Sequence, residues 1–261
     1  MAVHPDWLVP QWPVPPHVRA VCTTRAGGRS AGPYDTLNLG DHVGDHPLDV
    51  GANRAILHAA IQAAPVYLSQ VHGAQVVALS GKTPHGTEAD ACITHEPGLA
   101  CTILVADCLP VLLTSTQGTL VAAAHAGWRG LAGVEGRGVL ESVVEHFLAQ
   151  DLANRTQAAS KIIAWLGPCI GPDAFEVGAE VKAAFELHDP RAAALFKPLP
   201  HGKWLADLPG LARQRLRALG VTQVYGNDGS RPWCTVSNPS RFFSHRRDRV
   251  SGRMAACIWR D

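Results

Sequence analysis

The stretch of sequence that most constrains the fold is residues 105–130, VADCLPVLLTSTQGTLVAAAHAGWRG. Two apolar runs, 111–116 and 119–124, have the composition of buried strands, and Gln117-Gly118 between them is a turn signal. Pro110 lies at the start of the first run, where a missing hydrogen-bond donor is tolerated. We therefore predict a β-hairpin around which the rest of the chain is organised.

Reactive side chains stand at the open end of this hairpin. Cys108 precedes the first run and His125 ends the second, so strands that pair across the turn bring the thiol and the imidazole together. Asp107 lies next to the thiol, and the glycine-rich segment 127–133 then leads into a predicted helix. A thiol, an imidazole and a carboxylate gathered in this way indicate a functional site as well as a core.

Composition excludes several classes of protein. The chain has 261 residues and a formal net charge of +1, so nucleic acid is not an expected partner. No apolar run is long enough to span a membrane, and residues 1–17 lack the pattern of a signal peptide. Seven cysteines, an odd number without a CxxC pair, favour reduced thiols in a cytoplasmic protein over a disulfide framework.

The remaining periodicities predict one α+β domain over residues 1–261. Strands are expected at 18–24, 66–70, 75–79, 91–94, 99–106, 161–166 and 222–225, with 66–70 paired to 75–79. Helices are expected at 49–64, 132–149, 177–188 and 207–219, and the tail from 241 is expected to form a strand, a turn and a strand. Residues 1–17 are expected to form an extended arm anchored by Trp7 and Trp12.

Three residues have the chemistry of a metal site. A catalytic zinc typically takes three protein ligands and leaves one position for water, and His72, Cys108 and His125 offer two imidazoles and a thiolate. The spacing is not diagnostic, and a free cysteine is commonly a small buried hydrophobe. A fourth protein ligand would make the site structural and the protein a binding module, and Cys169 is the candidate for that ligand.

Six motifs together resemble one family. They are QVHGAQV (70–76), TEADACIT (87–94), VADCLPVLL (105–113), AAAHAGWRG (122–130), GPCIGPDAFEVG (167–178), and RFFSHRRD with SGRMAACIW (241–259). Over nearly its whole length the chain resembles the laccase-domain family, also described as polyphenol oxidase, purine nucleoside phosphorylase or peptidoglycan-editing factor. One departure is Phe175, where similar chains often carry tyrosine.

The resemblance implies a single-domain α+β fold, a layered sandwich of mixed β-sheets with flanking helices. It implies a zinc held by His72, Cys108 and His125. It also implies purine nucleoside chemistry, namely phosphorolysis of adenosine, inosine, guanosine and methylthioadenosine, together with deamination of adenosine. The expected partners are therefore small molecules, a nucleoside and phosphate, and the expected assembly is a monomer or a weak homo-oligomer.

These reactions need further residues. Deamination needs a water made nucleophilic by zinc and a group that moves protons. We expect the catalytic residues to be Cys108, His125 and Asp107, although the Asp107 carboxylate fits a structural hydrogen bond equally well. Phosphorolysis needs an anion site. We expect substrate and phosphate to be bound by Arg25, Asn38, His42, Arg129 and Arg246.

Two other activities use the same residues. Cys108 as a nucleophile with His125 as its base would give a cysteine-dependent amidohydrolase that edits peptidoglycan precursors. A copper-dependent polyphenol oxidase would need closely spaced histidine pairs of the HxH kind, and the thirteen histidines of this chain include none. Zinc is therefore the expected metal, and copper is the less favoured alternative.

Overall fold

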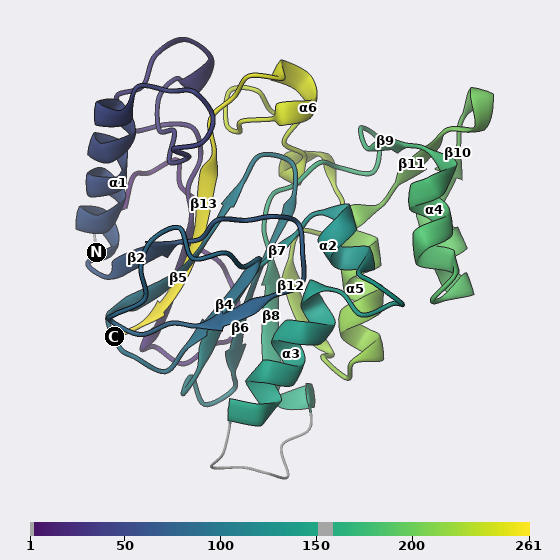
Figure 1. Ribbon diagram of the computed structural model, residues 1–261, viewed down its shortest axis with the longest axis horizontal. Helices are drawn as coiled ribbons and strands as arrows, with labels where there is room; N and C mark the ends of the chain where they lie inside the picture. The colour runs from purple at the N-terminus through teal and green to yellow at the C-terminus, as the bar shows by residue number, and fades with distance from the viewer. Residues whose placement is uncertain (1–2, 151–158) are drawn as a thin grey trace.

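Two large β-sheets lie face to face, with helices on their outer faces (Figure 1). The computed structural model describes residues 3–150 and 159–261. The expected α+β fold of mixed sheets with flanking helices is confirmed. That residues 1–261 form one domain stays a prediction.

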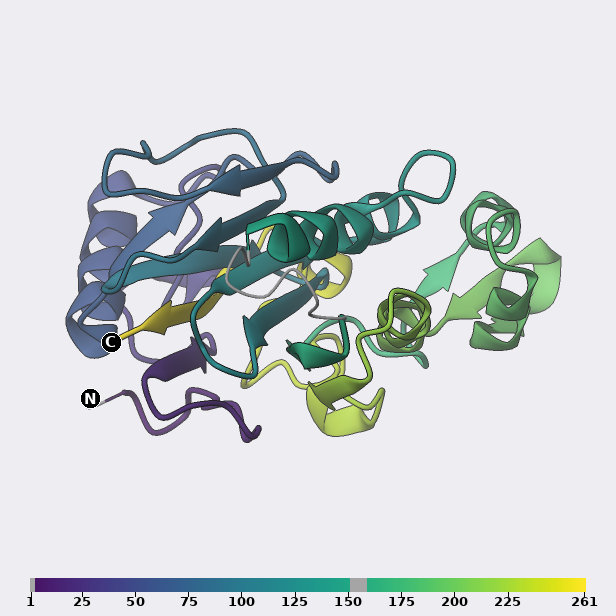
Figure 2. The same cartoon turned by 90° about the horizontal axis from the view of Figure 1, so that it is seen from below.

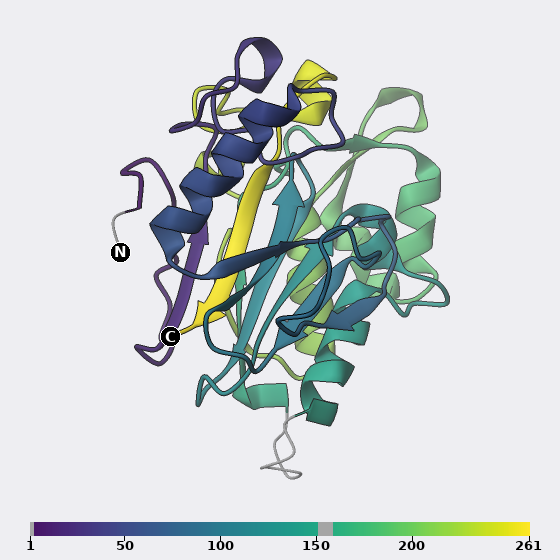
Figure 3. The ribbon, with the colours of Figure 1, turned by 60° about the vertical axis from the view of Figure 1, so that its left-hand side comes forward.

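The four-stranded sheet joins segments from opposite ends of the sequence. Its order is β1 (Val18–Cys22), β13 (Met254–Arg260), β5 (Leu99–Val105) and β2 (Ala64–Tyr67). β13 is antiparallel to both of its neighbours, whereas β2 runs parallel to β5. Figure 3 shows β1 in purple beside β13 in yellow, with α1 (Pro47–Ile61) across the same sheet.

The six-stranded sheet is built on the predicted hairpin. Its order is β12 (Gln223–Gly226), β8 (Ile162–Leu166), β6 (Leu109–Ser115), β7 (Val121–Ala126), β4 (Ala91–Thr94) and β3 (Val76–Ala78). β6 and β7 pair antiparallel with Pro110 opposite His125, so the hairpin and its register are confirmed. Every residue of both strands is buried, because neighbouring strands flank the hairpin and each face is covered.

Alternating side chains build the layers between these elements. In β13, Met254, Ala256 and Ile258 belong to the core between the two sheets, whereas Ala255, Cys257 and Trp259 belong to the core under α1. β7 alternates in the same way, with one set of side chains between the sheets and the other toward the helices. Apolar residues on both faces are what a strand in the interior of a layered fold requires.

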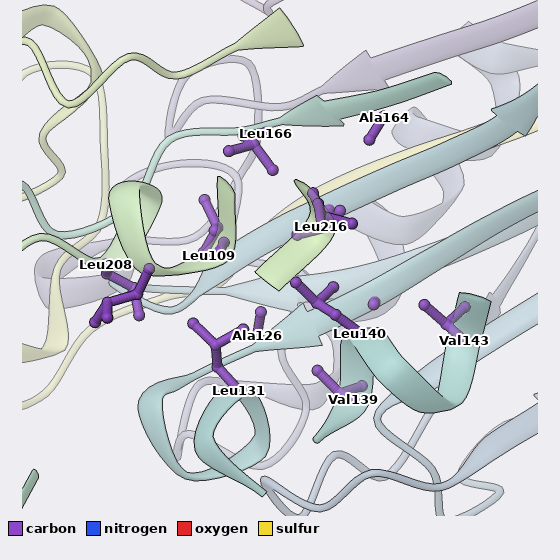
Figure 4. Close-up of a cluster of buried hydrophobic side chains, with 14 of the residues drawn as sticks. Leu109, Ala126, Leu131, Val139, Leu140, Val143, Ala164, Leu166, Leu208 and Leu216 are labelled. Atoms are coloured by element: carbon purple, nitrogen blue, oxygen red, sulfur yellow. The ribbon is translucent and has the colours of Figure 1, made fainter. Parts of the chain in front are cut away.

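The outer face of the six-stranded sheet is covered by α2 (Trp128–Ala132), α3 (Val139–Gln150) and α5 (Leu208–Ala218). Figure 4 shows Leu109 and Ala126, from the start of β6 and the end of β7, near Leu131 of α2 and Leu140 of α3. This cluster fixes the end of the hairpin at which Cys108 and His125 stand.

A smaller unit lies at one end of the molecule. The three-stranded sheet β10 (Phe196–Pro198), β11 (Trp204–Ala206) and β9 (Glu176–Val177) stands beside α4 (Ala179–Glu186) and away from the large sheets (Figure 2). The remaining elements are α6 (His245–Asp248) and short 3-10 segments at Gly32–Tyr34, Ala159–Lys161, Pro190–Leu195, Pro200–Gly202 and Arg231–Trp233. Within the described residues, no helix has the length and apolarity needed to cross a bilayer.

The pairing predicted for 66–70 and 75–79 is wrong. β2 pairs with β5 in the four-stranded sheet, and β3 pairs with β4 in the six-stranded sheet, both in parallel. Residues 68–75 therefore pass from one sheet to the other and carry His72 with them. A short apolar run predicts a strand but does not select its partner, which tertiary packing decides.

Two further segments differ from the prediction. The helix expected at 132–149 is broken, because Gly133 adopts a φ of +69° after α2 and α3 begins only at Val139. The strand expected after residue 241 is instead a turn followed by α6, whose first turn is capped by Ser244 accepting a hydrogen bond from Arg247 N. The helix expected at 207–219 is confirmed, with Asp207 as its N-cap.

The N-terminal arm lies against the four-stranded sheet. Trp7 is buried in the core under α1, and Trp12 packs partly buried against the core between the sheets. Both anchors expected from the sequence are therefore confirmed.

Candidate metal centre

His72, Cys108 and His125 come together at the open end of the hairpin. Their ligand atoms all lie within 4.8 Å of one another, and Cys108 Sγ is 3.7 Å from His72 Nε2. Zinc bonds of about 2.0 Å to nitrogen and 2.3 Å to sulfur put tetrahedral ligands about 3.3–3.5 Å apart. Two imidazoles and a thiolate at this spacing fit zinc or a similar borderline-soft ion. No other such group occurs in residues 3–150 and 159–261.

One buried carboxylate, Asp90, holds two of the three ligands. Its Oδ1 accepts hydrogen bonds from His125 Nδ1 at 2.8 Å and from His72 N at 2.9 Å. Its Oδ2 accepts from Gly73 N at 2.7 Å and from Val71 N at 3.1 Å. Because Nδ1 of His125 is engaged, Nε2 is the nitrogen left to bind a metal, as in carboxylate–histidine–zinc arrangements. Asp90 therefore positions the ligand set.

The loop that carries His72 is held from two sides. His72 has a φ of +62°, which is uncommon for a residue with a side chain, and the hydrogen bonds from the loop to Asp90 stabilise it there. On the other side, the amide of Gln70 donates to Leu104 O and accepts from Leu104 N, each at 2.8 Å. Protein contacts alone thus fix this loop beside the hairpin.

The electrostatics favour the thiolate that a metal requires. Burial would raise the pKa of Cys108, but the positive charge and hydrogen bonds of the neighbouring histidines lower it to about 6. Burial would lower the pKa of His125, but Cys108 and Asp90 raise it to about 9. Burial also opposes ionisation of Asp90, yet hydrogen bonds from His125 and from backbone N–H groups hold its pKa below the usual range. At neutral pH the thiolate is therefore the stable form of Cys108.

Two glycines of the HAGWRG motif let α2 approach the ligands. A Cβ on Gly127 would lie 2.8 Å from Cys108 Sγ and 2.9 Å from His72 Cδ2. A Cβ on Gly130 would lie 2.8 Å from the carbonyl oxygen of Gly73, in the His72 loop. Any larger residue at these two positions would displace the ligand set or its supporting loop.

The ligands face a pocket of about 420 Å³. Part of its wall is apolar and includes Leu104, Ile170, Phe175 and Leu208, and part is basic. The basic residues are His42, His245, Arg246, Arg249 and Arg253. A concave site with apolar walls and a few convergent polar groups is the usual form of a small-molecule site.

Asp107 lines the pocket but its carboxylate is engaged. Oδ1 accepts a hydrogen bond from Thr235 Oγ1, and Oδ2 accepts one from Arg246 N, both at 2.6 Å. Its φ is +89°, and its carbonyl oxygen accepts from Ile170 N. These contacts hold the segments of Ile170, Thr235 and Arg246 against the start of the hairpin, so Asp107 stabilises the wall of the pocket. A catalytic role for Asp107 stays a prediction.

Two of the five residues expected to bind substrate or phosphate lie on the pocket, namely His42 and Arg246. Arg246 donates from one guanidinium nitrogen to Glu176 O at 2.9 Å, and its guanidinium carbon lies 5.6 Å from the centre of the Phe175 ring. Phe175, the departure from tyrosine, therefore places an apolar ring beside a basic residue of the pocket.

The other three do not line the pocket. Arg25 donates to the backbone oxygens of Asp35 and Pro239. Arg129 is exposed on α2, with its guanidinium over the Trp128 ring. Asn38 is fully buried and accepts a hydrogen bond from Arg253 N, so it is linked to the pocket only through Arg253.

Cys169, the candidate fourth ligand, is not part of the group. It is completely buried, and its sulfur accepts a hydrogen bond from Asn227 Nδ2 at 3.4 Å. Burial, followed by the charge of Cys234, raises the pKa of its thiol well above the ordinary value.

Sequence reasoning missed Asp90 and Arg253. Each stands at the start of a buried strand, Asp90 before β4 and Arg253 before β13. A charged residue in such a place needs a partner, and this is the signal by which both could have been found.

Comparison with known proteins agrees with this arrangement. A family profile described as multi-copper polyphenol oxidoreductase laccase matches residues 19–261. Purine nucleoside phosphorylase YfiH of Escherichia coli is 49% identical over 255 residues, which cover 97% of this chain and 98% of that protein. A purine nucleoside phosphorylase of Pseudomonas aeruginosa is 46% identical, over 97% and 98% of the two chains.

Solved structures have the same fold. The crystal structure of the Neisseria meningitidis protein NMB0706 matches with a TM-score of 0.88 and 43% identity, over 98% of this chain and 99% of that one. YlmD of Geobacillus stearothermophilus matches with a TM-score of 0.81 and 31% identity, over 94% and 92%. The profile match and these relatives together show that the chain belongs to the laccase-like YfiH family.

Proposed function

We propose that this protein is a zinc-containing purine nucleoside phosphorylase that acts on adenosine, inosine, guanosine and methylthioadenosine and also deaminates adenosine. The observation that carries the proposal is the convergence of His72, Cys108 and His125 on one pocket. The names of the relatives support the purine substrate.

The pocket has the surfaces that phosphorolysis requires. Apolar side chains such as Ile170 and Phe175 offer contact to a purine, and the basic wall offers hydrogen bonds to phosphate. In the reaction, an oxygen of hydrogenphosphate bonds to C1′ of the ribose as the bond from C1′ to N9 breaks. The electron pair of that bond stays on the base, and the proton of hydrogenphosphate ends on the base.

The ligand set supports the choice of zinc. Asp90 fixes the orientation of His125 and of the His72 loop, and Cys108 is ionised at neutral pH. When bound, zinc supplies a Lewis acid beside the pocket. In the deamination, water adds its oxygen to C6 of adenine and ammonia leaves, so both reactions bring an oxygen nucleophile to a purine nucleoside.

The test separates the two reactions. Purified protein is incubated with adenosine, with and without phosphate and with and without a chelator, and adenine and inosine are measured by chromatography. We expect adenine only when phosphate is present, and inosine that disappears on chelation. Neither product across all four nucleosides would overturn the proposal.

A pair of matched variants places the activity at the metal centre. His72→Ala removes a ligand, whereas His58→Ala removes an exposed imidazole from the last turn of α1. The first variant should lose zinc and both activities, and the second should retain them. Equal activity in the two variants would contradict the placement.

A cysteine-dependent amidohydrolase is the second candidate. His125 lies between Asp90 and Cys108, which is the order of an acid, a base and a nucleophile, and the pKa of Cys108 is about 6. Zinc and nucleophilic catalysis compete for the same sulfur. Rapid alkylation of Cys108 in zinc-loaded protein, with no loss of zinc, would favour the hydrolase.

The copper-dependent oxidase rests on the description of the family profile. Multicopper chemistry needs several metal sites, and the described residues hold one His/Cys group. The proposal therefore assigns zinc, and metal analysis of the purified protein tests that assignment. Copper as the bound metal, with zinc absent, would contradict it.

The proposal also places the protein in the cytoplasm, as a monomer or weak homo-oligomer. All seven cysteines are free thiols, which fits a reducing compartment. Sedimentation over a range of concentrations measures the assembly. A tight oligomer at nanomolar concentration would contradict the expected state.

A further inference from the structure

Arg253 is a partly buried cation of the pocket that has no carboxylate partner among residues 3–150 and 159–261. It comes directly before β13 and lines the same pocket as the metal ligands. No ion pair in the described part of the chain includes it, whereas six other arginines have a carboxylate partner, three of them on exposed side chains. A guanidinium withdrawn from water without a counter-charge is costly, so such a residue usually serves an anion.

The protein holds Arg253 in place by contacts that lead away from the pocket. Its backbone N donates to Asn38 Oδ1 at 2.8 Å. One guanidinium nitrogen, NH1, donates to Ser251 O at 2.9 Å and to Gly252 O at 3.1 Å. Its stem lies against Gly40, where a Cβ would come within 2.7 Å of Arg253 Cγ. These contacts hold the backbone, the stem and NH1 of Arg253.

The opposite edge of the guanidinium is left open. Nε and NH2 of Arg253 have no hydrogen-bond acceptor among residues 3–150 and 159–261. Two parallel N–H groups on one edge match two oxygens of a phosphate. Burial lowers the pKa of Arg253, and the charges of Cys108 and Asp107 oppose that shift, which puts the guanidinium within electrostatic reach of the metal ligands.

The two other arginines of the pocket are less suited to this role. Arg246 also leaves Nε and NH2 without an acceptor among the described residues, since only NH1 donates, to Glu176 O, but its guanidinium stands against the Phe175 ring. Arg249 is exposed at the end of α6 and has a strained backbone with a φ of +61°. Arg253 differs from Arg246 in the burial of its guanidinium contacts, which are part-buried at Ser251 and Gly252, whereas that of Arg246 at Glu176 is exposed.

We propose that Arg253 binds the phosphate nucleophile, as hydrogenphosphate, through the open Nε and NH2 edge of its guanidinium. This inference rests on the proposed phosphorolysis and assigns its anion site. Deamination uses water and no phosphate, so it does not need Arg253. Asn38 is then a positioning residue, because it holds the backbone of Arg253 and does not touch the phosphate.

The direct test measures phosphate itself. Inorganic phosphate is titrated into zinc-loaded wild-type protein and into Arg253→Met, Arg253→Lys and Arg217→Met, with binding followed by calorimetry. Arg217 is an exposed arginine of α5, so its variant removes the same charge outside the pocket. Loss of a charged two-point contact should raise the Kd for phosphate in Arg253→Met about 10-fold or more. Arg253→Lys should restore part of the affinity, and Arg217→Met should match the wild type.

The kinetic test separates this inference from the proposed function. We expect Arg253→Met to raise KM for phosphate in phosphorolysis and to leave KM for adenosine and the rate of deamination unchanged. Zinc content and the melting temperature check that the variant is folded and loaded, and Arg253→Lys replaces it if it is not.

The outcomes differ clearly. If the wild type releases adenine with phosphate and Arg253→Met shows an unchanged KM for phosphate, the assignment of Arg253 is wrong and phosphorolysis stands. If the wild type releases no adenine, phosphorolysis is wrong, and the calorimetric titration still decides whether Arg253 binds phosphate. A rise in KM for adenosine instead of phosphate would also overturn the assignment.

Discussion

Replacing Asp90 by asparagine tests whether one carboxylate assembles the metal site. The two carboxylate oxygens of Asp90 accept four hydrogen bonds, from His125 Nδ1 and from the backbone N–H groups of Val71, His72 and Gly73. Asparagine keeps the shape but has a single oxygen, so two of these donors would face an NH2 group. A hydrogen bond to a charged group contributes about 1.5–3 kcal/mol. The ceiling for two lost bonds is therefore about 3–6 kcal/mol.

The expected effect lies at the lower end, because the His72 loop can turn its N–H groups toward water. We expect the free energy of unfolding of the metal-free protein to fall by about 3 kcal/mol in Asp90→Asn. Zinc affinity should fall about 10–100-fold, the usual effect of removing a partner of a ligand histidine. Urea unfolding measures the first quantity, and competition with a chromophoric chelator measures the second.

Glu88→Gln is the matched control, since it makes the same change on an exposed side chain two residues earlier. It should alter stability by no more than about 0.5 kcal/mol. Zinc affinity of Asp90→Asn within about 3-fold of the wild type would refute the argument that Asp90 assembles the site. Unchanged affinity combined with lost activity would mean that Asp90 acts on the substrate instead.

Three further predictions concern the same framework. Gly127→Ala should weaken zinc binding about 10-fold or more in chelator competition, because its Cβ would lie 2.8 Å from Cys108 Sγ, while Gly51→Ala, with open space around its Cβ, should not; equal zinc affinity in the two variants would contradict this. In metal-free protein the Cys108 pKa of about 6 lies below the ordinary value of 9.0, so the stabilisation by its thiolate is complete above pH 9 and lost as the pH falls through 6. Thiolate absorbance against pH measures the midpoint of this titration. A midpoint near 9 would contradict the lowering of the Cys108 pKa by the neighbouring histidines. Arg215→Met should lower stability by about 3 kcal/mol in urea unfolding, because it removes a buried guanidinium and leaves the partly buried Glu141 without its charge 3.1 Å away; a loss below about 1 kcal/mol would show that the pair contributes little.

The hairpin and the grouping of His72, Cys108 and His125 could be predicted because their signals are local or come from a resemblance in sequence. The apolar runs and the Gln117-Gly118 turn fix the register of β6 against β7, and that register places Cys108 near His125. His72 entered through the motif that contains it. Its loop could not be placed, because the strands on either side of it join different sheets.

The partners of the supporting residues could not be predicted because they are distant in sequence. Asp90 contacts a loop 17 to 19 positions away and a histidine 35 positions away. Arg253 is held by Asn38, 215 positions away. No periodicity or turn rule relates such pairs, and only the completed four-stranded sheet brings Arg253 to the pocket. Arg25 and Arg129, which we expected to bind substrate or phosphate, do not line the pocket, and that role stays a prediction.

The position of β13 in the four-stranded sheet has a consequence for biosynthesis. β13 pairs with β5 from Met254 opposite Val105, so more than half of the chain is translated between the two partners. At about 5–20 residues per second, the ribosome takes about 7–30 s to supply the missing strand. During that interval the apolar β5 offers an unpaired edge to any other nascent chain, which is an opportunity for aggregation. The step that completes this sheet also brings Arg253 to the pocket. A polypeptide stalled before β13 would therefore expose the edge of β5 to aggregation and would lack the arginine proposed to bind phosphate.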